Sequence, residues 1–286
     1  MSVIFQNLTK EEADTYSLVL SASRVSHRPI RGEHGWDLWV KDAQDETALK
    51  AIEKYIDENQ DQTDRSAPLY YSDYKRTFTG IWVSMGLLIF HVAIALEHQS
   101  EFFIKVFGAS AFHIINGELY RTVTALMLHA NALHILGNVV GLSLFGTAVC
   151  SIMGMGVGWL MILISGIAGN LINALLHMGG HVSIGASTSI FGAIGILSAY
   201  QFVKKFWAPG ERLKAFLPLC GGLALLGVLG SGEHSDLMAH LFGFLSGMIA
   251  GSVYGVFIKR TVSAGYQAGF TFLILGIITA AWMRAF

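Results

Sequence analysis

The chain has 286 residues, of which 53% are hydrophobic and only 14% are charged, and its formal net charge is -1. Soluble globular domains carry about 25% charged residues, so the composition excludes an ordinary soluble protein, and the balanced charge excludes an electrostatic nucleic-acid binder. Charged side chains are unevenly placed, because 24 of the 39 lie before residue 77. The chain therefore divides into a polar N-terminal part and a strongly apolar remainder.

The N-terminal part, residues 1–64, is predicted to be a small α+β domain. Strand formers are frequent in Tyr16–Ala22 and apolar residues alternate in Trp36–Val40, which predicts two strands. Apolar residues recur at helical spacing over Asp45–Asn59, which predicts a helix. No catalytic constellation is present here, so we expect a structural or regulatory role, followed by a polar linker over residues 65–77.

Seven apolar runs follow, and each is long enough for a membrane-crossing helix, which takes about 20 residues. They are residues 78–96, 133–152, 156–176, 187–203, 213–230, 237–258 and 269–286. The weaker stretch 102–115 is broken by Lys105 and His113 and is expected to lie in the membrane interface. Because no long apolar run precedes residue 78, the first span is expected to act as an uncleaved anchor.

Positively charged residues predict the orientation of these spans, because Lys and Arg are enriched in cytoplasmic loops. If every run crosses the membrane, one side carries Lys75, Arg76, Lys204, Lys205, Arg212, Lys214, Lys259 and Arg260. The opposite side carries only Lys105, Arg121 and Arg284. We therefore expect a cytoplasmic N-terminus and an outer C-terminus, in the plasma (inner) membrane of a prokaryote. Cys150 and Cys220 lie in apolar runs and are expected to pack without forming a disulfide.

This topology brings two polar residues to the same depth. Ser187 is the first residue of the fourth run and His240 is the fourth residue of the sixth, and both runs pass from the outer side inward. A histidine inside a membrane segment is costly and usually functional or paired, and serine beside histidine suits a nucleophile and its base. Small residues on these two runs would allow close contact of the helices: Gly192, Gly195, Gly243, Gly247, Gly251 and Gly255.

Three motifs together resemble the rhomboid intramembrane serine proteases. They are "HANALHILGN" at 129–138, "GASTSIFG" at 185–192 and "AHLFGFLSG" at 239–247, and the resemblance covers roughly residues 78–258. It implies an all-α polytopic membrane fold with a six-helix core, to which the last span adds a seventh helix. It also implies that Ser187 is the nucleophile and His240 its general base.

The resemblance also implies roles for neighbouring residues. His134 and Asn138, four apart on one helix face, would stabilise the oxyanion together with the backbone N–H of Ser187. Phe191 would pack against the catalytic imidazole, and Gly185 would allow a backbone conformation that bulkier residues avoid. Structural alternatives stay open: a helix cap for Ser187, bonds to backbone or water for His134 and Asn138, and plain core packing for Phe191. One departure is Thr188, which stands where many rhomboids have glycine.

Other matches are interpreted as structural. Tyr120 and Arg121 match an aromatic–Arg pair of the family's first loop, and Arg121 is expected to bond Glu118 or backbone. His129 also matches a family position. Asp236 lies four residues before His240 and could approach it, but the family works with a Ser–His dyad, so Asp236 is left out of the site.

The sequence leaves three other functions open. A metal site is suggested by seven histidines on the outer side, but no HExxH motif occurs; they are His113, His129, His134, His177, His181, His234 and His240. A transporter would place polar residues at mid-membrane, and here they gather near one face. A catalytically inactive rhomboid-like protein that binds membrane helices is the third.

The favoured prediction is a serine endopeptidase that cuts single-span or multi-span membrane proteins in or near their transmembrane segments, without metal, organic cofactor or nucleic acid.

Overall fold

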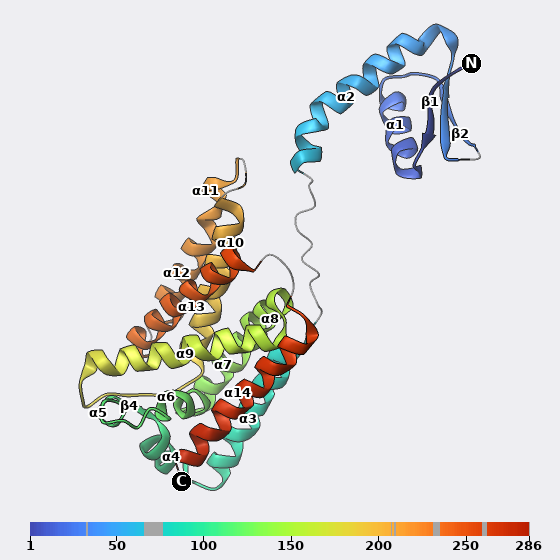
Figure 1. Ribbon diagram of the computed structural model, residues 1–286. Coiled ribbons are helices and arrows are strands. Elements are labelled where there is room, and N and C mark those ends of the chain that lie inside the picture. Colours follow the sequence, from blue (N-terminus) through green and yellow to red (C-terminus); the bar gives the residue numbers. More distant parts are fainter. Residues whose placement is uncertain are drawn as a thin grey trace. The chain divides into compact units, whose positions relative to one another are not determined.

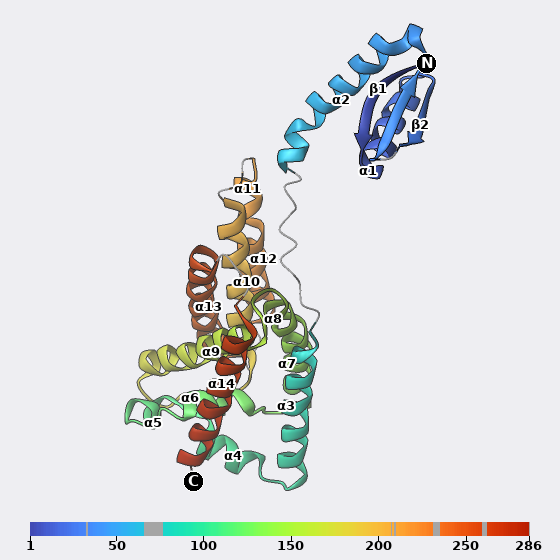
Figure 2. The same ribbon diagram turned by 45° about the vertical axis from the view of Figure 1, so that its right-hand side comes forward.

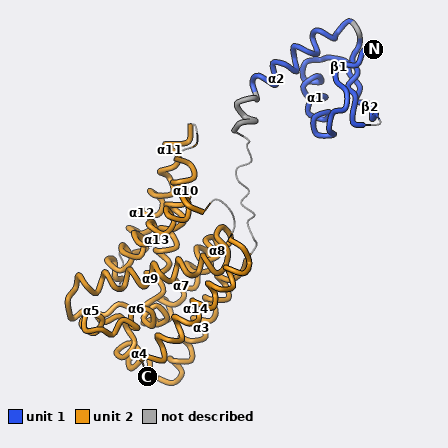
Figure 3. Tube along the Cα trace, in the orientation of Figure 1, with its two compact units in different colours: residues 1–71 blue, residues 72–286 orange. Residues whose placement is uncertain are grey.

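The computed structural model divides the chain into two compact units, Met1–Tyr71 and Ser72–Phe286 (Figure 3). It describes residues 1–32, 34–65, 77–206, 208, 210–230, 235–258 and 262–285. Most of the predicted linker lies outside these ranges, as do His234 and four of the basic residues used for orientation, Lys75, Arg76, Lys259 and Arg260.

The N-terminal unit is a three-stranded antiparallel sheet with two helices. The strand order is β1-β3-β2, and the strands are β1 (Ser2–Leu8), β2 (His27–Arg31) and β3 (Trp36–Val40). The helices are α1 (Lys10–Ala22), which follows β1, and α2 (Asp45–Arg65), which follows β3 after the short 3-10 turn η1 (Asp42–Gln44). Leu20, Leu38 and Ile52 are fully buried between these elements. The predicted strand at 36–40 and the helix from residue 45 are confirmed, whereas β1 and β2 had no counterpart in the sequence prediction.

The predicted strand at Tyr16–Ala22 is wrong, because this segment is the second half of α1. A capping box starts the helix: the Thr9 hydroxyl accepts a hydrogen bond from the Glu12 amide (3.2 Å), and the Glu12 carboxylate accepts one from the Thr9 amide (2.8 Å). Ala13 and Leu20, seven residues apart, both face the core. This local signal at the helix start outweighs the strand propensity of the residues that follow.

The second unit is helical, and six of its described segments are long and apolar enough to cross a membrane. These segments are Thr79–Leu96, Ala132–Met153, Met155–His177, Arg212–Leu229, Leu237–Phe257 and Ala264–Arg284. Four of these segments are single helices, in chain order α3, α9, α13 and α14. The second segment consists of α7 (Ala132–Gly141), the π-helical turn η3 (Leu142–Gly146) and α8 (Thr147–Met153). The fourth consists of α11 (Arg212–Ala215) and α12 (Leu217–Leu229). The chain is therefore an integral, multi-pass membrane protein.

The fourth predicted span, residues 187–203, forms α10 (Ser187–Phe206) but is not among those six segments. Its first half contains serine, threonine and glycine, and Lys204 and Lys205 end it. More than half of its residues are buried against α9, α12 and α13, and these helices lie together in both ribbon views (Figures 1 and 2). Because protein rather than lipid surrounds α10, the helix does not need to be as apolar as its neighbours.

Short elements occupy the stretch between α3 and α7. They are α4 (Ser100–Phe107), β4 (Ala109–Ser110), α5 (Ala111–Ile115), α6 (Arg121–Thr124) and the 3-10 turn η2 (Ala125–Met127). No long helix spans residues 102–115 in this described stretch, in agreement with the prediction; a position in the interface stays a prediction. At its far end α14 reaches this region, where Trp282 packs on Phe107 with ring centroids 4.8 Å apart (Figure 1).

Arg121 links several parts of the stretch between α3 and α7 by hydrogen bonds. Its side chain is 6% exposed, and it donates to the Glu118 carboxylate (2.6 Å) and to the carbonyls of Lys105 (3.1 Å) and Gly108 (3.2 Å). Burial raises the pKa of the Glu118 carboxyl, but hydrogen bonds from Arg121 and Tyr120 outweigh it and hold that pKa below its ordinary value. The expected contacts of Arg121, both to Glu118 and to backbone, are thus present.

Candidate active site

The close approach of α10 and α13 positions the site. Three glycines of α13, four residues apart, each lie against a carbonyl of α10, and a Cβ at any of them would collide with that oxygen. The pairs are Gly243 with Thr188, Gly247 with Gly192, and Gly251 with Ile196. Because both series ascend together, the helices run in the same direction, as the topology predicts. Bare backbone on both sides lets the helices meet closely.

This packing brings the first residue of α10 against the first turn of α13. The Oγ of Ser187 and the Nε2 of His240 are 2.7 Å apart, a hydrogen bond. His240 is 5% exposed, and Ser187 is partly exposed. A serine–imidazole contact of this length is the geometry in which an imidazole accepts a hydroxyl proton.

The other nitrogen of His240 faces neutral groups. Its Nδ1 lies 3.4 Å from the carbonyl oxygen of Gly230 and 3.3 Å from the hydroxyl of Ser235, which itself donates to the Gly230 carbonyl at 2.7 Å. The carboxylate of Asp236 instead bonds the Ala239 amide, Asn173 and His181. Among the described residues, therefore, no carboxylate takes the third position of a triad.

Phe191 lies one turn after Ser187 and packs on the imidazole. The ring centroids of Phe191 and His240 are 4.7 Å apart with an interplanar angle of 34°, and Phe191 is 4% exposed. A ring in this position restricts rotation of the imidazole, as the resemblance implies.

His134 lies beside the serine and presents a donor. Asn131 caps α7 by accepting from the His134 amide (2.9 Å), and the Ala130 amide donates to His134 Nδ1 (3.4 Å). Because Nδ1 is the acceptor, Nε2 carries the proton. Gly185 lines the space between the two side chains: its φ is +116°, and a Cβ there would be 2.6 Å from His134 Nε2 and 3.4 Å from Ser187 Oγ.

Asn138 is buried one turn further along α7, and its amide donates to the His134 carbonyl at 3.0 Å. This hydrogen bond stays within α7, so it does not join Asn138 to Ser187. An amide nitrogen carries two hydrogens, which leaves one for a further acceptor.

Thr188, the departure from the family pattern, is accommodated by glycines. The residue is 2% exposed and lies in the first turn of α10, with its methyl group against Gly169 of α9 and Gly243 of α13. The extra bulk of threonine therefore fills space that neighbouring glycines leave open, and α10 starts at Ser187.

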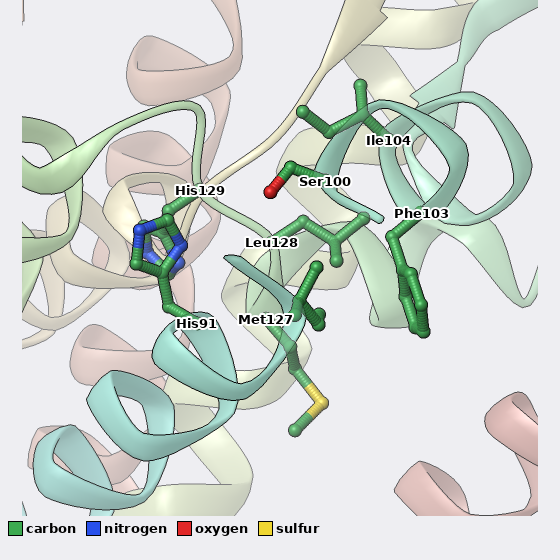
Figure 4. A pocket seen from close by; sticks show the side chains of 8 residues that line it. His91, Ser100, Phe103, Ile104, Met127, Leu128 and His129 are labelled. Atoms are coloured by element: carbon green, nitrogen blue, oxygen red, sulfur yellow. The ribbon is translucent and has the colours of Figure 1, made fainter. Parts of the chain in front are cut away.

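A row of histidines leads away from the site, and the sequence had indicated only a structural role for His129. Its ring lies edge-on to His134 (5.1 Å) and to His91 of α3 (6.1 Å), and its Nε2 is 3.5 Å from the Ala186 amide. Burial, together with His134 and His91, lowers the pKa of His129 to about 3. Figure 4 shows His91 and His129 together at one side of a small cavity of about 10 Å³, with the Ser100 hydroxyl directed toward them.

The remaining histidines of the metal hypothesis do not converge. His113 bonds Ser110 (2.9 Å), and His181 pairs with Asp236 (2.6 Å) while stacking on His177 (4.1 Å). Among the described residues, which exclude His234, no three metal-binding side chains form a group that could hold an ion.

Known proteins share a domain with this chain. The family model of the rhomboid domain matches residues 116–257, which contain all four polar residues of the candidate site. YdcA of Bacillus subtilis is 30% identical over 136 residues, which cover 48% of this chain and 67% of YdcA. Rhomboid-like protease 2 of Toxoplasma gondii is 32% identical over 158 residues, or 52% of each chain.

A human relative, Inactive rhomboid protein 2, is 32% identical over 189 residues, which cover 62% of this chain and 21% of that protein. The chain thus spans between about a fifth and two thirds of the length of these relatives. The matched domain, the relatives and the multi-pass helical fold show that the chain belongs to the rhomboid family.

Proposed function

We propose that this protein is an intramembrane serine endopeptidase that hydrolyses peptide bonds in or near transmembrane segments of membrane proteins. The observation that carries the proposal is the 2.7 Å hydrogen bond between Ser187 Oγ and His240 Nε2. Membership of a family that includes proteins named as proteases supports it.

In the proposed reaction, His240 Nε2 takes the hydroxyl proton while Ser187 Oγ attacks the carbonyl carbon of the scissile bond. The tetrahedral oxyanion forms beside His134 Nε2 and the first amides of α10, which have no partner inside the helix. Collapse breaks the C–N bond, and His240 returns the proton to the leaving amine. Water then attacks the acyl-enzyme while His240 accepts a proton from it; collapse breaks the ester C–O bond, and His240 returns the proton to Ser187 Oγ.

The oxyanion donors in this proposal are His134, the Ser187 backbone N–H and Asn138. Each donor of this kind typically lowers the barrier by about 3 kcal/mol. Of the two side chains, His134 is better placed to donate to the oxyanion, because its protonated Nε2 faces the gap at Gly185. Asn138 needs its second N–H to reach the same point, since the first is held by the His134 carbonyl.

The membrane placement is part of the proposal. Ser187 and His240 lie at the same ends of parallel helices, and we infer that these ends face the outer (periplasmic or extracellular) side, with the unit 1–64 in the cytoplasm. A substrate helix must unwind locally before attack, because its peptide bonds are shielded by their own hydrogen bonds. Helix-breaking or small residues near the cut would ease unwinding.

A panel of single-span membrane proteins tests the proposal. We expect the purified wild type to cut members of the panel, and Ser187→Ala and His240→Ala to cut none. A wild type without activity on the panel, or a Ser187→Ala variant that cuts normally, would remove the basis for a protease. The alternative is a catalytically inactive protein that binds membrane helices, in line with the name of one relative; it predicts that wild type and Ser187→Ala retain the same helix-binding partners without cleavage.

A further inference from the structure

One carboxylate at the start of α13 serves two purposes at once. Oδ1 of Asp236 accepts the Ala239 amide at 3.0 Å and so caps α13. Oδ2 accepts two more hydrogen bonds, from Asn173 Nδ2 and from His181 Nε2, each at 2.6 Å. The Asp236 side chain is 15% exposed, so these bonds are largely shielded from water.

The three residues belong to segments that meet at the candidate site. Asn173 lies near the end of α9, and His181 lies in the segment 178–186 that leads directly into Ser187. Asp236 precedes His240 by four residues, or about one helical turn of 5.4 Å. The shared Oδ2 thus joins the segment that carries the nucleophile to the helix that carries the base.

Neighbouring contacts stiffen this arrangement. The ring of His177 stacks on His181 with centroids 4.1 Å apart, and His177 Nδ1 lies 3.0 Å from the Asn173 carbonyl. Burial raises the pKa of the Asp236 carboxyl, but hydrogen bonds from His181, the Ala239 amide and Ser183 outweigh it and hold that pKa below its ordinary value. The carboxylate is therefore ionised at neutral pH and accepts strong, charge-assisted hydrogen bonds.

Apart from Ser187, the imidazole of His240 has only weak hydrogen-bond partners, and Phe191 restricts its rotation without fixing the position of the helical turn that carries it. Its Nδ1 meets only long contacts, 3.4 Å to Gly230 and 3.3 Å to Ser235, and no carboxylate among the described residues. The place of the imidazole therefore depends on where the first turn of α13 is held. A misplacement of about 1 Å costs on the order of 100-fold in rate.

We propose that Asp236, His181 and Asn173 form a clamp that sets the Ser187–His240 distance by tying the first turn of α13 to the segment entering α10. The three are positioning residues and touch neither reacting atom. The inference rests on the proposed function for its kinetic consequence, but the clamp itself is a structural claim with a separate readout.

Substitutions at Asp236 separate the cap from the clamp. Serine is a good N-cap but has one oxygen, so Asp236→Ser keeps the bond to the Ala239 amide and loses Oδ2. Asp236→Ala loses both. His181→Leu removes the partner, and His181→Gln offers a replacement amide donor. His27→Leu is the matched control, because it deletes a histidine of the N-terminal unit, whose Nδ1 lies 2.9 Å from the Val25 carbonyl.

The kinetic readout is the rate of fluorophosphonate labelling at Ser187, with kcat and KM on a cleaved substrate. We expect Asp236→Ser and His181→Leu each to lower labelling and kcat by about 10- to 100-fold with KM unchanged. The double variant falls no further than Asp236→Ser, since that substitution already removes the bond from His181 to Oδ2, and His181→Gln and His27→Leu stay near wild type. Wild-type rates in Asp236→Ser and His181→Leu, or effects that multiply in the double variant, would overturn the clamp.

Hydrogen exchange of the purified protein tests the clamp without any activity. Asp236→Ser and His181→Leu should each speed exchange in both segments, 178–190 and 235–245, whereas His27→Leu, in the N-terminal unit, should change neither. Unchanged exchange in these segments overturns the clamp even if the wild type is a protease. Faster exchange together with a wild type that is not labelled keeps the clamp and rejects the proposed function.

Discussion

Gly185→Ala tests whether the gap between His134 and Ser187 is the place where the oxyanion forms. The added Cβ would lie 2.6 Å from His134 Nε2 and 2.8 Å from its Cε1. Ordinary contact begins near 3.4 Å, so the imidazole must retreat by about 0.8 Å. Because a donor displaced by about 1 Å loses most of its effect, we expect kcat and the labelling rate of Ser187 to fall by about 100-fold.

Backbone strain must be separated from this displacement, since φ at Gly185 is +116° and alanine there costs about 1–3 kcal/mol. Gly180 is the matched control: its φ is +72°, and no atom lies within 4 Å of an added Cβ. Gly180→Ala should share the loss of thermal stability and keep the labelling rate. If Gly185→Ala labels as fast as Gly180→Ala, the gap at Gly185 is not the oxyanion site.

Three further predictions concern packing, pH and the loop before α7. Gly247→Ala forces α13 away from the Gly192 carbonyl, so it should lower the free energy of unfolding by about 1–3 kcal/mol and abolish labelling of Ser187. Gly276→Ala, on α14 with no atom within 4 Å of the added Cβ, should change neither the stability nor the labelling. His129, whose pKa is lowered to about 3, stays neutral when folded and takes a proton below about pH 6.5 when unfolded. Stability should therefore fall by up to about 1.4 kcal/mol per pH unit as pH drops from 6.5 toward 3, and thermal melts of His129→Gln should lack that slope; an unchanged slope contradicts it. Arg121→Ala should lower stability by about 3 kcal/mol in denaturation experiments, because the carbonyls of Lys105 and Gly108 would lose their hydrogen-bond donor. A loss near zero would contradict a stabilising role for Arg121.

The features best predicted from the sequence are the membrane segments, which follow from apolar runs, and the direction of each segment, which follows from counting membrane crossings. Apolar runs marked the membrane segments, and counting crossings placed Ser187 and His240 at one end of parallel helices, where the structure has them in contact. The catalytic roles of these residues and the oxyanion roles of His134 and Asn138 stay predictions. In the N-terminal unit, the capping box of Thr9 and Glu12 starts α1, although the strand propensity of Tyr16–Ala22 had predicted a strand.

Other features depend on loop geometry that no spacing reveals. His181 and Asp236 are 55 residues apart, and their contact requires the segment 178–186 to fold back over the start of α13. In the sequence, His181 is one of several histidines predicted on the outer side, and Asp236 is notable only because it lies four residues before His240. The burial of α10 was similarly hidden, because composition alone cannot show which helix lies at the centre of a bundle.

Site-mapped labelling of the purified chain with a fluorophosphonate tests the Ser187–His240 pair most directly, with wild type and His240→Ala compared by mass spectrometry. We predict that the wild-type adduct lies on Ser187 and that its formation slows by orders of magnitude without the imidazole. An adduct at another residue, or equal labelling of Ser187 in His240→Ala, would contradict a serine activated by that histidine.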